Sequence, residues 1–136
     1  MIVADSNLIA YLLIPGDKSA LADEVLLKDA DWAVPSICRS EMRNILTLYM
    51  RHKGMSLSQA GMTMEKAEAI WRNREFAVPS NDVLGLTCHH KITAYDAEFV
   101  VLAQQLAVPF VTFDKLVRKA FPNVALSAED FLAEKY

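Results

Sequence analysis

The sequence predicts an α/β protein built on a parallel sheet that helices cover on both faces. Short apolar runs that suit strands alternate along the whole chain with longer stretches that suit helices. These runs are unbroken, which is typical of parallel strands buried on both faces. The 136 residues contain no repeat and no linker, and a chain of this length can bury a sizeable core. We therefore expect a single domain that spans residues 1–136.

Turn and capping residues place the individual elements. Five strands are expected at residues 2–4, 32–34, 76–78, 109–112 and 124–126. The first strand runs into a helix at Asp5. Further helices are expected over residues 17–30 (opened by Asp17), 35–52 (with Pro35 in the first turn), 56–74 (a Ser56–Gln59 capping box), 81–91, 93–107, 115–120 and from 127 onwards.

Composition narrows the class of protein. Hydrophobic residues make up 53% and charged residues 23%, which excludes a disordered tail or a collagen-like repeat. No apolar run approaches the roughly 18 residues that span a membrane, and the first residues lack the basic segment of a secretory signal. Cys38 and Cys88 lack metal-ligand spacing and are interpreted as buried thiols in a reducing compartment. We expect a cytoplasmic protein.

The net charge of −3 lacks the basic excess of a typical nucleic-acid binder. Two bound divalent cations would change the sum to −3 + 4 = +1, so an acidic chain can still act on phosphates. The residues expected to contact phosphate, unless they only solvate helix faces, are Arg39, Arg43, Lys115, Arg118 and Lys119.

Two carboxylates follow predicted strands directly. Asp5 comes after the first strand, and Asp114 follows the fourth with only Phe113 between it and Thr112. In parallel sheets, ligands bind beyond the carboxyl ends of the strands, where the strand order reverses. Each Asp could equally cap the helix that follows it.

Two further carboxylates interrupt apolar helix faces. At about 100° per residue, Glu41 falls within an arc that also holds Ile37, Cys38, Met42, Ile45, Leu48 and Tyr49. Asp96 lies among Tyr95, Phe99, Val100 and Leu102, although it could instead close a capping box with Thr93. An acid on an apolar face is costly unless it is paired, protonated or bound to a cation.

Together the four acids predict one acidic crevice. Clustered carboxylates repel each other, and a divalent cation removes that cost. Ligands that are all oxygen suit Mg²⁺ or Mn²⁺, and such sites support two-metal phosphodiester chemistry. The number of ions stays open at this point.

Four segments, in this order along the chain, resemble the PIN-domain ribonucleases and, within them, the VapC-type toxins of toxin–antitoxin modules. They are MIVADSNLIAYLL, SEMRNIL, TAYDAEFVVLA and VTFDKL. The resemblance covers essentially the whole chain. It implies a three-layer α/β/α sandwich around a five-stranded parallel sheet, and a Mg²⁺-dependent endoribonuclease that cleaves single-stranded RNA by metal-activated water.

The resemblance also assigns roles to residues. Asp5, Glu41, Asp96 and Asp114 match the family's metal-binding and catalytic acids, while Asn7, Asn44 and Thr112 match positions that help to order the site. It further implies a VapB-type antitoxin whose C-terminal segment covers the acidic site, and a homodimer. The RNA target stays open between transfer, ribosomal and messenger RNA.

Two alternatives stay open. The chain could be a non-catalytic α/β binding module whose acids serve only as helix caps. Five of the six methionines lie between residues 42 and 64, and they could form either an ordinary helical-hairpin core or an adaptable groove for a partner helix.

Overall fold

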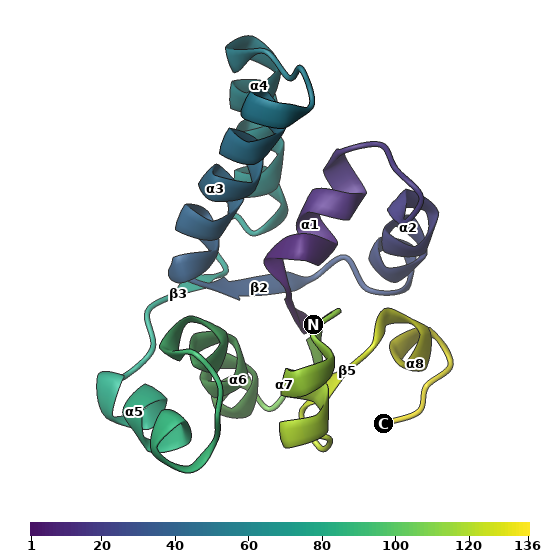
Figure 1. Cartoon of the computed structure of the whole chain (residues 1–136). Coiled ribbons are helices and arrows are strands. Elements are labelled where there is room, and N and C mark those ends of the chain that lie inside the picture. Colours follow the sequence, from purple (N-terminus) through teal and green to yellow (C-terminus); the bar gives the residue numbers. More distant parts are fainter.

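The computed structural model describes all 136 residues as a five-stranded sheet with eight helices (Figure 1). The strands are β1 (Ile2–Ala4), β2 (Trp32–Pro35), β3 (Glu75–Phe76), β4 (Phe110–Val111) and β5 (Ala125–Leu126). The helices are α1 (Ser6–Leu13), α2 (Ser19–Lys28), α3 (Ile37–His52), α4 (Leu57–Ile70), α5 (Ser80–His89), α6 (Ala94–Leu106), α7 (Lys115–Ala120) and α8 (Ala128–Leu132). None of these helices has the length and apolar character needed to cross a membrane.

All strand pairs are parallel, and the order across the sheet is β3-β2-β1-β4-β5. The chain first builds outwards from β1 through β2 to β3, and then returns to the other side of β1 to form β4 and β5. The strand order therefore reverses between β1 and β4, which is where ligands bind in sheets of this kind.

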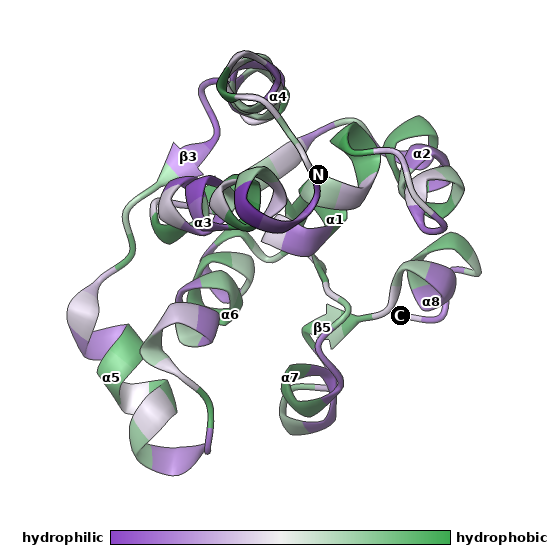
Figure 2. Cartoon of the chain, turned by 45° about the horizontal axis from the view of Figure 1, so that its top comes forward, coloured by the Kyte–Doolittle hydropathy of each residue, from purple (hydrophilic) through white to green (hydrophobic).

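Helices cover both faces of the sheet, as expected. In Figure 1, α1 to α4 lie on one side of the sheet and α5, α6 and α7 on the other, while α8 lies beside α2. The helices are amphipathic, and hydrophilic and hydrophobic segments alternate along their ribbons in Figure 2. Thirty buried residues form one continuous core that includes β1, β2, β4 and β5. The predicted three-layer α/β/α arrangement is confirmed.

Capping residues set several helix boundaries as the sequence predicted. Ser56 and Gln59 form the full capping box of α4, Thr93 caps α6, and Ser127 caps α8. These caps satisfy backbone N–H groups that a helix start leaves unpaired.

Other local predictions were wrong. Asp17 does not open α2, which starts after Lys18 without a side-chain cap. Pro35 ends β2 rather than entering α3. Helix α4 ends at Ile70, and Asn73 adopts a left-handed φ of 65° in the turn to β3. Cys38 is buried as predicted, but Cys88 is exposed on α5.

Candidate functional site

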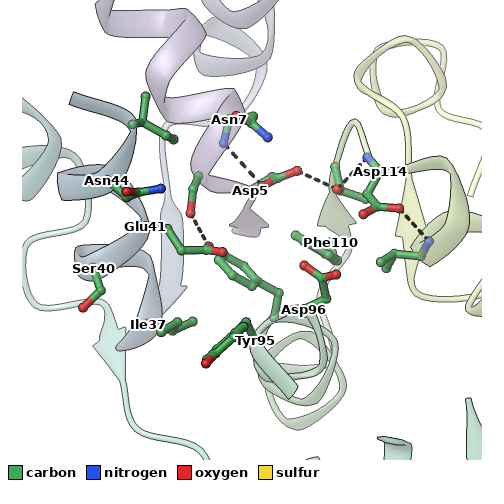
Figure 3. A pocket seen from close by; sticks show the side chains of 15 residues that line it. Asp5, Asn7, Ile37, Ser40, Glu41, Asn44, Tyr95, Asp96, Phe110 and Asp114 are labelled. Atoms are coloured by element: carbon green, nitrogen blue, oxygen red, sulfur yellow. Dashed lines mark hydrogen bonds between the residues drawn. The ribbon is translucent and has the colours of Figure 1, made fainter. Parts of the chain in front are cut away.

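A pocket of about 350 Å³ opens at the carboxyl ends of β1 and β4, where the strand order reverses. All seven residues that the sequence singled out line it, and they come from the segments around α1, α3, α6 and the β4–α7 junction (Figure 3). These residues are Asp5, Asn7, Glu41, Asn44, Asp96, Thr112 and Asp114. The fold therefore brings the predicted site residues to one place.

Asp5 and Asp114 are joined through Thr112. Thr112 is buried, with 1% of its surface exposed. Its hydroxyl donates to Asp5 Oδ2 at 2.6 Å and accepts from the backbone N–H of Asp114 at 3.1 Å. The backbone N–H of Phe113 also donates to Asp5 Oδ2, and that of Asn7 donates to Oδ1. These contacts fix the Asp5 carboxylate at the end of β1.

Both of these aspartates also cap helices, as the alternative interpretation expected. Asp5 is the N-cap of α1, and Asp114 accepts from the N–H of Val117 at the start of α7. Capping uses one oxygen of Asp114 and leaves the other directed to the pocket for a ligand (Figure 3). Capping and ligand binding are therefore compatible at the same residue.

Glu41 reaches the pocket from α3. Cys38, Met42 and Leu46 form the buried stripe of that helix, and Glu41 lies at its edge, half-buried. Leu48, expected in the same stripe, is 46% exposed. The Ser6 hydroxyl, which lies 3.3 Å from Cys38 Sγ, donates to Glu41 Oε1 at 2.7 Å and so ties α3 to α1.

Asp96 sits in the first turn of α6 and points into the pocket (Figure 3). Its backbone N–H donates to the Thr93 hydroxyl, which is the cap of this helix. No bond from the Asp96 carboxylate to the Thr93 backbone completes a capping box. The carboxylate lines the pocket, where burial raises its pKa and its contact with the Thr93 side chain lowers it by less.

No cation of the protein neutralises these acids. None of the ion pairs of the chain includes Asp5, Glu41, Asp96 or Asp114. Burial raises the pKa of Asp5, Glu41 and Asp96, and the neighbouring charges add to this: Asp96 acts on Asp5, and Asp5 acts on Glu41. The surroundings of these carboxyl groups therefore disfavour their charged forms. A bound cation would stabilise those charges.

The donor set suits a hard divalent cation, because every charged group in the pocket is a carboxylate and neither His nor Cys lines it. In the present side-chain positions, no three His, Cys, Asp or Glu groups are arranged to hold one ion. The pocket thus supplies the right ligand chemistry, while a shared ion requires the side chains to turn further inwards.

Sequence reasoning missed Ser6, Ser40 and Tyr95, which also line the pocket. Ser6 directly follows Asp5, but its contact with Glu41 joins residues 35 positions apart and has no local signal. None of the five basic residues expected to contact phosphate lines the pocket, and Arg39 instead pairs with Glu68 and Glu75.

The sequence is similar to that of a protein named Ribonuclease VapC3 from Pyrobaculum aerophilum. The two chains are 23% identical over 124 residues, which cover 89% of this chain and 95% of the relative. The predicted resemblance to VapC-type ribonucleases is confirmed. No protein-family model matches the chain.

Two solved structures share the fold. PAE2754 from Pyrobaculum aerophilum aligns with a TM-score of 0.76 at 18% identity and covers 98% of this chain and 87% of its own. FitAcB from Neisseria gonorrhoeae aligns with a TM-score of 0.71, also at 18% identity, and covers 95% of this chain and 99% of its own. The predicted PIN-like fold, a parallel sheet between helical layers, is thereby confirmed.

Proposed function

We propose that this chain is a Mg²⁺-dependent endoribonuclease toxin of the VapBC type, which cleaves single-stranded RNA. One observation carries the proposal: carboxylates from four separate segments line a single pocket at the strand reversal, and no basic side chain pairs with any of them. The similarity to Ribonuclease VapC3 over most of both chains supports the same reaction class.

In this proposal, Asp5, Glu41, Asp96 and Asp114 hold the cation, with Mn²⁺ as a substitute for Mg²⁺. When bound, Mg²⁺ supplies positive charge that acidifies a water molecule and neutralises the phosphate. Thr112 and the N–H groups of Asn7 and Phe113 orient Asp5, and Ser6 orients Glu41. In-line attack of water on phosphorus would form one P–O bond, break the P–O3′ bond and leave a 5′-phosphate and a 3′-hydroxyl.

Two first-turn aspartates on adjacent helices make a matched test. Asp96 on α6 lines the acidic pocket, whereas Asp82 on α5 does not and accepts instead from Gln105. We expect Asp96→Asn to lower RNA cleavage by at least about 10³-fold, since a charge on the ion's binding face is lost. Asp82→Asn should cleave at close to the wild-type rate. Cleavage is measured on end-labelled single-stranded RNA with Mg²⁺, and again with EDTA.

Equal cleavage by wild type and Asp96→Asn would falsify the assignment. The competing interpretation, a binding module whose acids only cap helices, has support in the caps that Asp5 and Asp114 form. Calorimetric titration with Mn²⁺ separates the two. The proposed nuclease has a millimolar or tighter site that Asp96→Asn weakens, and a module with capping acids alone has no such site.

The proposal includes a VapB-type antitoxin as partner and a homodimer as the assembled form.

The methionines between residues 42 and 64 fit both interpretations, since some lie in the core and others line a groove. Met42 is buried in the core, whereas Met55 and Met62 line a groove beside the end of α1. Lys53 and Lys66 line the same groove, so its chemistry suits an apolar segment that carries acidic residues. Light scattering of the purified chain, alone and co-expressed with the neighbouring reading frame, tests both assemblies.

A further inference from the structure

Tyr95 exposes its ring at the rim of the acidic pocket. The residue is 61% exposed although it lines the same pocket as the four carboxylates. In Figure 3 its ring lies beside Ile37 and next to Asp96, and its hydroxyl points away from the carboxylates. The ring rather than the hydroxyl is therefore the part of Tyr95 that borders the pocket.

The other exposed aromatic ring, that of Tyr136, has an aromatic partner, and so does the half-buried ring of Tyr11. Tyr11 packs edge-on against Phe113 with 5.0 Å between the ring centroids, and Tyr136 stacks on Phe131 at 5.8 Å. No aromatic or cationic group of the chain packs against Tyr95. An aromatic face is thus left open at the mouth of the pocket.

The pocket lining combines charged and apolar groups. Besides the four carboxylates it includes Ile37, Ile45, Phe99 and Phe110, and in Figure 3 the Tyr95 ring lies beside Ile37. A nucleotide combines the same two kinds of group, with a charged phosphate and a flat base a few bonds away. Because Tyr95 directly precedes Asp96 on α6, a base on the Tyr95 ring can belong to the same nucleotide as a phosphate near the carboxylates, or to the next one.

We infer that Tyr95 is the base-stacking residue of this site, which holds one unpaired nucleobase of the substrate strand on its exposed ring. The inference rests on the proposed function and adds how the strand is recognised. Stacking on an aromatic ring is available only to a base released from a duplex, and it tolerates any base. The ring therefore selects single strands without reading a particular sequence.

The test combines protein and RNA changes. The wild-type cleavage position in a short single-stranded RNA is mapped first, and an abasic ribose then replaces each nucleoside around it in turn. One position should raise the wild-type KM by about 5- to 160-fold, which corresponds to the measured range of stacking contributions. Tyr95→Ala should show this loss on the intact RNA and no further loss on the abasic RNA. Tyr95→Phe should behave like wild type.

Leu84→Ala is the matched control, because Leu84 is a similarly exposed apolar residue on the neighbouring helix α5 and lies outside the pocket. A purely structural role of Tyr95 would lower activity on intact and abasic RNA alike, and that result overturns the inference. So does a change of oligomeric state in Tyr95→Ala without a change in abasic sensitivity, which would assign the ring to a protein interface.

Binding of a labelled single strand, measured by fluorescence anisotropy with Mg²⁺, separates failure of this inference from failure of the proposed function. If wild type cleaves RNA but Tyr95→Ala and wild type have the same KM and affinity, only the stacking role is wrong. If wild type binds the strand through Tyr95 but cleaves nothing, only the nuclease function is wrong. If wild type neither binds nor cleaves, both are wrong.

Discussion

Helix α3 contributes one residue to each of two groups of charged residues, which the fold treats in opposite ways. On one side, Glu41 faces the pocket with Asp5 and Asp96 as neighbours, and burial together with these negative charges raises its pKa. On the other side, Arg39 joins Glu68 and Glu75 through contacts of 3.0 and 2.6 Å. The guanidinium of Arg39 lowers the pKa of Glu75.

The difference separates an acid that stabilises the fold from one that is available for chemistry. Glu75 has its counter-charge within the chain, so its ionised form is stabilised and the contact holds β3 against α3 and α4. Glu41 has only the Ser6 hydroxyl, so its negative charge is left for a cation from solution. The pKa values of two glutamates with the same intrinsic chemistry thus shift in opposite directions because of their surroundings alone.

The largest expected effect is on RNA cleavage. Glu41→Gln should lower kcat by at least about 10³-fold, because the neutral amide weakens the ion's binding face while it keeps an oxygen to accept from Ser6. Glu75→Gln should change kcat by no more than about twofold, since Glu75 lies outside the pocket. Equal losses in both variants, measured at saturating RNA, would remove the distinction between the two groups.

A smaller loss of cleavage is expected when Thr112 is changed. Thr112 hydrogen-bonds to Asp5 and does not contact Glu68 or Glu75, the partners of Arg39. Thr112→Val removes the 2.6 Å hydrogen bond while it keeps the shape of the side chain. Loss of an orienting partner typically costs about 10- to 100-fold in activity or metal affinity, and Thr112→Ser should restore most of it. A Thr112→Val variant with wild-type kcat and Mn²⁺ affinity would show that Asp5 needs no such support.

The smallest effects concern stability in EDTA, and they have opposite signs. Glu75 has a lowered pKa in the folded state, so its contribution is present at neutral pH and is lost as pH falls below its ordinary value of 4.5. Glu75→Gln should therefore lower the neutral-pH stability by about 0.5–1 kcal/mol, and the difference from wild type should disappear in acid.

Glu41 behaves in reverse, because its folded pKa is raised. Its charge destabilises the fold at neutral pH, and the penalty vanishes as pH falls towards the ordinary value of 4.5. Glu41→Gln should therefore melt at a higher temperature than wild type at neutral pH and at the same temperature in acid. Melting curves across this pH range check both variants. If Glu75→Gln and Glu41→Gln shift the melting temperature in the same direction at neutral pH, the contrast between a paired and an unpaired glutamate is wrong.

The element pattern followed from local signals, and so did the choice of the four acids that line the pocket. Apolar runs predicted all five strands, and Ser56, Thr93 and Ser127 predicted three helix starts. Boundaries that depend on packing were less accurate. The strand expected at residues 76–78 is Glu75–Phe76, because its length is set by the partner residues Val34 and Pro35 in β2.

The place where Asp5 and Asp114 meet could also be predicted from the sequence. Asp5 and Asp114 each follow a strand, and parallel strands end at the same edge of a sheet. Tyr95 was expected on the apolar side of α6, but it is exposed at the pocket rim. Helical periodicity gives the direction of a side chain and cannot say whether another element covers it.

The sequence alone determined the fold class and the four carboxylates, because these depend on residue type and on spacing along the chain. Only the tertiary structure decided which charges are neutralised: the Arg39 guanidinium meets Glu75, whereas Glu41 meets only the neutral Ser6 hydroxyl, and 36 and 35 positions separate these partners. The physical reason is that the energy of a charge depends on its burial and on the groups within a few ångströms, and these distances exist only once the chain has folded.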